Sequence, residues 1–89
     1  MLIVKRVKGI VQVPVYMRDY TEPAEYDYEL SYRGFTAYLI KRGTTWWAVK
    51  DSKWLVMGAR SKKLAEVEIT EFVDKHFGKL VENGYIEKE

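Results

Sequence analysis

Apolar and polar positions alternate along much of the first half of the chain, with the period of two that is typical of β-strands. The alternation predicts strands over residues 2–17 and 26–41. Residues 18–25 are mostly polar and include a proline, which predicts a loop between the two strands. Pro14 has no N–H to donate to a β-ladder, so the first strand is expected to lie at a sheet edge or to contain a bulge.

The glycines next to these strands suggest how the strands pair. If Gly9 faces Gly34, then Val13 faces Leu30, and the apolar side chains of both strands fall on one face of the sheet. Paired glycines also indicate a shared bend. We therefore predict one long antiparallel pair in this register.

Two further strands are predicted over residues 45–50 and 53–59, joined by a two-residue turn at 51–52. Asp and Ser occupy this turn, and both residue types are common in turns. In the resulting hairpin, Val49 faces Trp54.

The adjacent tryptophans of this hairpin must point to opposite faces of the sheet, because side chains alternate along a strand. The register puts Trp46 opposite Met57 on one face. It puts Trp47 opposite Val56 on the other face. Both faces are therefore apolar, and a single helix covers only one of them. The second face is expected to be covered by the bent N-terminal strands, by a second copy of the chain in a homodimer, or by another partner.

The last element is predicted to be a helix over about residues 62–77, with residue 82 as an alternative end. Ser61 is the predicted N-cap. Residues 65–70 also alternate as a strand would, but residues 72–80 do not, so the helix is preferred. The residues expected to face the sheet are Ile69, Phe72, Val73 and Phe77.

These elements predict an α+β fold: a bent antiparallel sheet of four to five strands, followed by one C-terminal helix packed on one face. The 89 residues are expected to form a single domain. Asn83 and Gly84 are either the cap of the helix or the turn of a hairpin. Tyr85 and Ile86 are expected to pack back against the fold.

The residue types that are present exclude several kinds of site. The chain has no Cys, which rules out disulfides, thiolate metal ligands and a Cys nucleophile. Its one histidine, His76, lies in the apolar stripe of the predicted helix, and its three serines lie in no nucleophile motif. We therefore expect no enzymatic activity, no metal and no cofactor. With no apolar run long enough to span a membrane and no signal peptide, we expect a cytoplasmic protein without a membrane partner.

The net charge of +2 hides a segregation of basic and acidic residues. Residues 33–63 carry eight Lys or Arg against one Asp, between acidic stretches at 21–32 and 64–89. Basic residues interleaved with aromatic ones suit a nucleic-acid partner, because cations neutralise phosphates and rings stack on bases. The order of three strands and a helix is also similar to that of sheet-type DNA-reading domains such as integrase arm-binding and AP2-like domains, in element order alone. The candidate nucleic-acid-binding residues are Arg33, Lys41, Arg42, Trp46, Lys50, Lys53, Arg60, Lys62 and Lys63.

The alternative is a protein-binding regulator or inhibitor, such as a viral or mobile-element accessory protein acting on a host protein. Residues 19–32 are acidic and rich in tyrosine, so this segment could imitate phosphates. Tyr and Trp are favoured anchors of protein interfaces. The candidate interface residues are Tyr26, Tyr28, Tyr38, Trp46, Leu55 and Met57.

Overall fold

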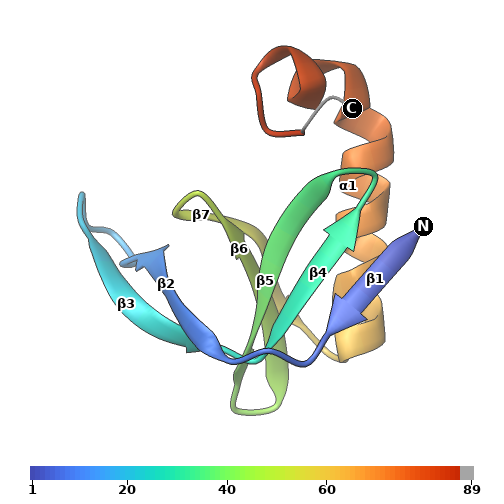
Figure 1. Cartoon of the computed structure of the whole chain (residues 1–89). Helices are drawn as coiled ribbons and strands as arrows, with labels where there is room; N and C mark the ends of the chain where they lie inside the picture. Colours follow the sequence, from blue (N-terminus) through green and yellow to red (C-terminus); the bar gives the residue numbers. More distant parts are fainter. Residues whose placement is uncertain (87–89) are drawn as a thin grey trace.

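The computed structural model describes residues 1–86 and has the expected α+β architecture (Figure 1). Five antiparallel strands form one sheet in the order β1-β4-β5-β6-β7, while β2 and β3 form a separate two-stranded hairpin. In this part of the chain one helix, α1, follows the last strand and packs on one face of the sheet. The elements are β1 (Leu2–Lys5), β2 (Gly9–Pro14), β3 (Thr21–Tyr26), β4 (Tyr28–Tyr32), β5 (Phe35–Arg42), β6 (Thr45–Lys50), β7 (Lys53–Ala59) and α1 (Lys62–Glu82).

The predictions of one strand over residues 2–17 and one over residues 26–41 are both wrong. The first range forms two strands with different partners, and the second contains β4 and β5, which pair with each other across the turn at 33–34. β1 pairs with β4, so that Val4 faces Leu30. β2 pairs with β3, so that Val13 faces Glu22 and not Leu30. The hairpin of β2 and β3 closes a shorter loop than the predicted pairing would, and a shorter loop costs less chain entropy to close.

The predicted loop over residues 18–25 is consequently also wrong, because most of it belongs to β3. The true turn of the hairpin is held by two backbone hydrogen bonds. The Val15 N–H donates to the Tyr20 carbonyl at 3.2 Å, and the Arg18 N–H donates to the Val15 carbonyl at 3.0 Å. Met17 adopts a φ of 58° between them, a conformation that few residues other than glycine take readily.

Gly9, which suggested the predicted register, has a different role. It faces Tyr26 across the hairpin and not Gly34. A Cβ atom on Gly9 would lie 2.5 Å from the Tyr26 hydroxyl oxygen, so the missing side chain makes room for the tyrosine ring.

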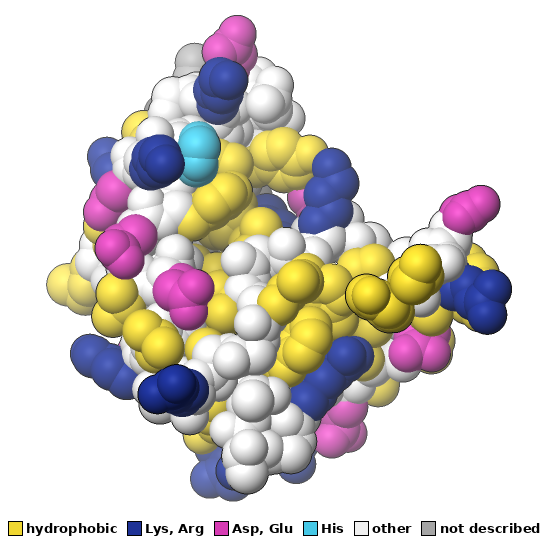
Figure 2. Space-filling model, turned by 180° about the vertical axis from the view of Figure 1, so that it is seen from behind, with side chains coloured by type: hydrophobic (Ala, Val, Ile, Leu, Met, Phe, Trp, Pro, Cys, Tyr) yellow, Lys and Arg dark blue, Asp and Glu magenta, His cyan; other side chains and the backbone are white. Residues whose placement is uncertain are grey.

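The β2–β3 hairpin leaves the sheet at residues 6–8 and at Asp27, and it covers part of the face opposite α1 (Figure 1). Seen from behind, it forms an arm that projects from the body (Figure 2). The first of the three expected coverings is therefore present over that part of the face. The second core beneath the hairpin contains Val13, Ile40 and Val49, with Val11, Ala24, Tyr26, Tyr38 and Trp54 packed around it.

The main core lies between the sheet and α1. Ile69 and Val73 of the helix are fully buried, as predicted. Phe72 and Phe77 are half-buried and pack against the same core, and the Phe72 ring lies 6.1 Å from that of Phe35. The helix begins after its predicted N-cap, where the Ser61 hydroxyl accepts from the Leu64 N–H at 3.1 Å.

The helix runs to Glu82, which is the longer of the two predicted ends. Its backbone is non-helical at His76, so the helix is kinked there. Gly84 has a φ of 79° and reverses the chain, and the Tyr85 N–H then donates to the Leu80 carbonyl at 2.9 Å. The segment therefore caps the helix up to Ile86, which is buried against the core.

The β6–β7 hairpin confirms one predicted pair and corrects the rest. Val49 faces Trp54, as expected from the turn. The register then shifts twice, so that Trp46 faces Ala59 and not Met57. These bulges turn Val56 into the core beneath α1, whereas the Trp47–Val56 pair was predicted on the other face.

Candidate nucleic-acid interface

The antiparallel sheet brings five strand termini and the start of α1 to one end of the molecule. β1, β5 and β7 end there, while β4 and β6 begin there. Basic residues follow or end most of these strands. We call this region the basic end; it comprises Arg6, Lys8, Lys41, Arg42, Arg60, Lys62 and Lys63.

The fold divides the predicted basic set between two ends. The basic end holds five of the predicted basic residues: Lys41, Arg42, Arg60, Lys62 and Lys63. Trp46, the aromatic member of the predicted set, lies beside them at the start of β6. Arg33, Lys50 and Lys53 lie at the opposite end, which carries the β4–β5 and β6–β7 turns and is called the turn end below.

Arg6 and Lys8 were missed by the sequence analysis. They lie in the link between β1 and β2, which was predicted to be the interior of one strand. The signal that could have found them is the cluster of basic residues 5–8 just before Gly9, which is more typical of a bend than of a buried strand.

A shallow cleft of about 240 Å³ opens at the basic end. Arg6, Lys8 and Lys41 line it together with the rings of Tyr28 and Trp46. One carboxylate, that of Asp27, also lines the cleft, and it accepts a hydrogen bond from the Lys41 backbone N–H at 3.1 Å. The cleft therefore has an excess of positive charge.

Two of the lysines lie over aromatic faces. The Lys41 Nζ is 5.8 Å from the centroid of the Trp46 ring, and the Lys62 Nζ is 4.8 Å from that of Tyr28. The two rings are 5.8 Å apart and both are half-buried. Cation–π contacts of this kind hold the ammonium groups at the surface. They also occupy ring faces that an unpaired base would need for stacking.

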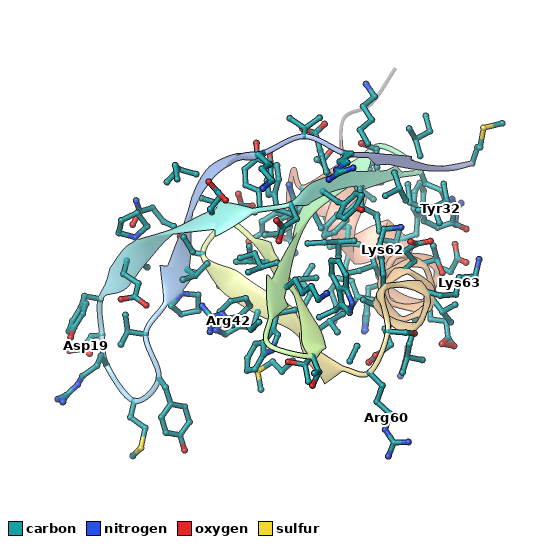
Figure 3. All side chains as sticks on the ribbon, turned by 90° about the horizontal axis from the view of Figure 1, so that it is seen from below. Asp19, Tyr32, Arg42, Arg60, Lys62 and Lys63 are labelled. Carbon is teal, nitrogen blue, oxygen red and sulfur yellow. The ribbon has the colours of Figure 1, made fainter. Side chains whose placement is uncertain are left out.

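Arg42 lies on the other side of the sheet. Its guanidinium is 5.2 Å from the Trp47 ring and 4.7 Å from the Trp54 ring. Figure 3, which looks at the molecule from below, shows Arg42 toward the hairpin, Lys62 and Lys63 beside α1, and Arg60 pointing away from the body. The basic groups thus surround this end and do not form a single row.

Acidic partners neutralise only some of these groups. The Lys62 Nζ lies 2.7 Å from a carboxylate oxygen of Glu66, which is 8% exposed and needs this partner. Lys8 lies 3.9 Å from Glu25, with both side chains largely exposed. Within residues 1–86, no carboxylate lies within 4.0 Å of the charged groups of Arg6, Lys41, Arg42, Arg60 or Lys63.

At the turn end, Arg33 is already engaged. Its Nη1 atom donates to Asp74 of α1 at 2.8 Å, and the Tyr32 hydroxyl donates to both oxygens of the same carboxylate at 3.0 and 3.1 Å. The hydrogen bond from Arg33, and then that from Tyr32, lowers the pKa of Asp74. The bond to Asp74 in turn raises the pKa of Tyr32. Arg33 therefore joins the sheet to the helix.

Most of the predicted protein-interface residues are packed against the two cores. Tyr26, Tyr28, Tyr38, Trp46 and Leu55 are half-buried there. The rings of Tyr26 and Tyr38 lie 4.5 Å apart, and burial raises the pKa of Tyr38. Met57 is the exposed member of the set, at 66%.

The most exposed aromatic side chains lie instead at the tip of the β2–β3 hairpin. Tyr16 is 88% exposed, Met17 83% and Tyr20 60%. The sequence analysis placed these residues at the end of a strand and in a loop, and their apolar character in a polar stretch was the available signal.

Other kinds of site find little support in the described residues. Within 1–86, no three His, Cys, Asp or Glu side chains are arranged to hold a metal ion. His76 packs against Phe72, with ring centroids 5.0 Å apart. The helix of this part of the chain is too polar to cross a membrane. Comparisons with protein-family models, with curated proteins and with solved structures find no match to this chain.

Proposed function

We propose that this protein is a non-catalytic binding protein that contacts the phosphate backbone of nucleic acid through its basic end. One observation carries the proposal: the fold gathers seven basic side chains from three separate segments of the chain, residues 6–8, 41–42 and 60–63, at one end. Gathering like charges costs free energy in the isolated protein, and a polyanionic partner would recover it.

The surroundings of the basic end favour contacts to phosphates over contacts to bases. The Trp46 and Tyr28 rings carry lysines on their faces, so stacking would require displacing them. The face opposite α1 is partly covered by the hairpin, so the sheet does not present a bare face to a groove. Contacts to phosphates position a protein without reading sequence, so we expect little sequence preference.

The salt dependence of binding tests this proposal directly. Five basic groups of this end lack a carboxylate within 4.0 Å inside residues 1–86. Four or five phosphate contacts give a slope of log affinity against log salt of about −3.6 to −4.5 on duplex DNA. Fluorescence anisotropy over a range of salt concentrations measures this slope.

A matched pair of double variants locates the interface. Lys41→Gln with Arg60→Gln should make the slope shallower by about 1.8, since each lost contact removes about 0.9. Lys50→Gln with Lys53→Gln removes the same charge from the turn end and should leave the slope unchanged. Equal effects of the two pairs, or no binding tighter than about 100 µM at low salt, would count against the proposal.

The second candidate function is binding to a protein, and the hairpin tip favours it. Tyr16, Met17 and Tyr20 are exposed on a turn that two backbone hydrogen bonds hold in shape. Exposed Tyr and Met side chains on an ordered projection suit the centre of a protein interface. A pull-down from nuclease-treated lysate tests it: a specific partner should be lost with Tyr16→Ser and Met17→Ser but kept with Lys41→Gln and Arg60→Gln.

A further inference from the structure

The turn end holds a pocket of about 190 Å³ between the sheet and the C-terminal half of α1. Phe35, Leu55, Phe72 and Leu80 line it, and Tyr85 completes the wall. The helix cap is what brings Tyr85 there, because Gly84 reverses the chain and the Tyr85 N–H then binds the Leu80 carbonyl. On this side of the molecule, Figure 2 shows a hollow bordered by hydrophobic side chains and by basic ones.

Two lysines stand at the border of this pocket. Lys50 and Lys53 are direct partners across the β6–β7 hairpin, so their side chains leave the same face of the sheet. The Lys50 Nζ lies 5.1 Å from the centroid of the Phe35 ring, which forms part of the wall. Like charges on directly opposed strand residues repel each other, so this placement destabilises the hairpin by itself.

Neither lysine is neutralised by the described residues around it. Within residues 1–86, no carboxylate oxygen lies within 4.0 Å of either ammonium group, although Asp51 occupies the turn between them and also lines the pocket. The pocket therefore combines an apolar interior with a positively charged border. Such a border attracts an anion and repels a cation of the same shape.

We propose that this pocket binds a small amphipathic anion: a carboxylate attached to one apolar group of about the size of a benzene ring. The volume sets the size of the group, since a cavity of roughly 150 Å³ is enough to hold benzene. The two lysines set the charge, because a carboxylate between them would relieve their repulsion. This site lies at the opposite end from the basic end, so its test is independent of nucleic-acid binding.

Titration of the ¹⁵N-labelled protein with 3-phenylpropionate, followed by NMR, tests the proposal. We expect a saturable change in the amide signals of Leu55, Phe72 and Tyr85, with a Kd of about 1 mM. The matched amine, 3-phenylpropylamine, keeps the ring and reverses the charge. It should bind at least about tenfold more weakly.

Charge variants complete the test. Lys50→Gln with Lys53→Gln should weaken 3-phenylpropionate binding about tenfold, because the charged partners of the carboxylate are gone. Lys41→Gln with Arg60→Gln, far from the pocket, should leave it unchanged. The proposal is overturned if the acid causes no saturable change or if the amine binds as well as the acid. It is also overturned if Lys50→Gln with Lys53→Gln does not weaken binding of the acid more than the control double variant does.

Discussion

The two ends of the sheet both combine basic residues with aromatic ones but use them differently. At the turn end, Arg33 is joined to Asp74 and the aromatic rings line an apolar pocket. At the basic end, five basic groups have no carboxylate within 4.0 Å in residues 1–86. The comparison teaches that residue type does not decide a role in this protein. Arg33 has a counter-charge in Asp74, whereas Arg6 has no carboxylate within 4.0 Å in residues 1–86, so it is the surroundings that separate these two arginines.

This difference separates stability from binding within one small sheet. Buried apolar groups such as Phe35 and Leu80 hold the turn end together. The basic end retains charge repulsion that a partner would relieve, and such a surface typically lowers the stability of the free protein. Substitutions of the buried apolar groups at the turn end should therefore change the free energy of unfolding, and substitutions of the basic groups at the basic end should change binding to nucleic acid.

The largest expected effect is on stability, at the turn end. Phe35 is 2% exposed and contacts the helix through Phe72. Phe35→Ala should lower the free energy of unfolding by about 3–5 kcal/mol, because it leaves a cavity in the main core. Urea denaturation followed by tryptophan fluorescence measures the change.

The control for this substitution lies in the β5–β6 turn of the basic end. Thr44 is exposed there, and Thr44→Ala should change the free energy of unfolding by less than about 0.5 kcal/mol. If the two substitutions have similar effects, the stability of the sheet is not concentrated at the turn end.

The parts of the fold that were predictable from the sequence are those that local signals determine. Ser61 marks the start of α1 through its capping hydroxyl, and the turn at 51–52 fixes the Val49–Trp54 pair. The bulges in β7 were not predictable, because they depend on turning Val56 into a core formed by distant residues. Bulges of this kind leave little local trace in the sequence.

The N-terminal register failed for a related reason. Both the predicted pairing of Val13 with Leu30 and the observed pairing of Val13 with Glu22 put Val13 on a face with apolar neighbours. The pattern of alternation alone does not choose between these two registers. The candidate site was affected directly, since the wrong register hid the bend that brings Arg6 and Lys8 to the basic end. Lys41 and Trp46 were predicted as members of one surface, and the structure does place them together.

The next effect compares one arginine from each end. Arg6→Gln should weaken binding to duplex DNA about eightfold at 0.1 M salt, which is the loss expected for one phosphate contact. Arg33→Gln should leave the affinity within about twofold, because its guanidinium is held by Asp74. The effect on melting temperature should run the other way: Arg33→Gln should lower it more than Arg6→Gln does. A loss of affinity with Arg33→Gln as large as that with Arg6→Gln would show that both ends face the nucleic acid.

The smallest effect is a pH dependence that belongs to the turn end alone. In the folded protein the pKa of Asp74 is below its ordinary value of 3.8, so its contribution to stability is present above that value and is lost as the pH falls through the lowered pKa. The pKa of Tyr32 is above its ordinary value of 10.0, so its contribution is present below that value and is lost as the pH rises through the raised pKa. The hydrogen bond between Tyr32 and Asp74 thus stabilises the fold in the pH window between these limits.

The difference in melting temperature between the wild type and Tyr32→Phe should be small and constant between about pH 5 and pH 9, and it should shrink on both sides. Lys41→Gln should show no such window, since Lys41 is not part of this group of hydrogen bonds. A Tyr32→Phe difference that persists unchanged at pH 2 would mean that the hydroxyl stabilises the fold without the ionised carboxylate of Asp74.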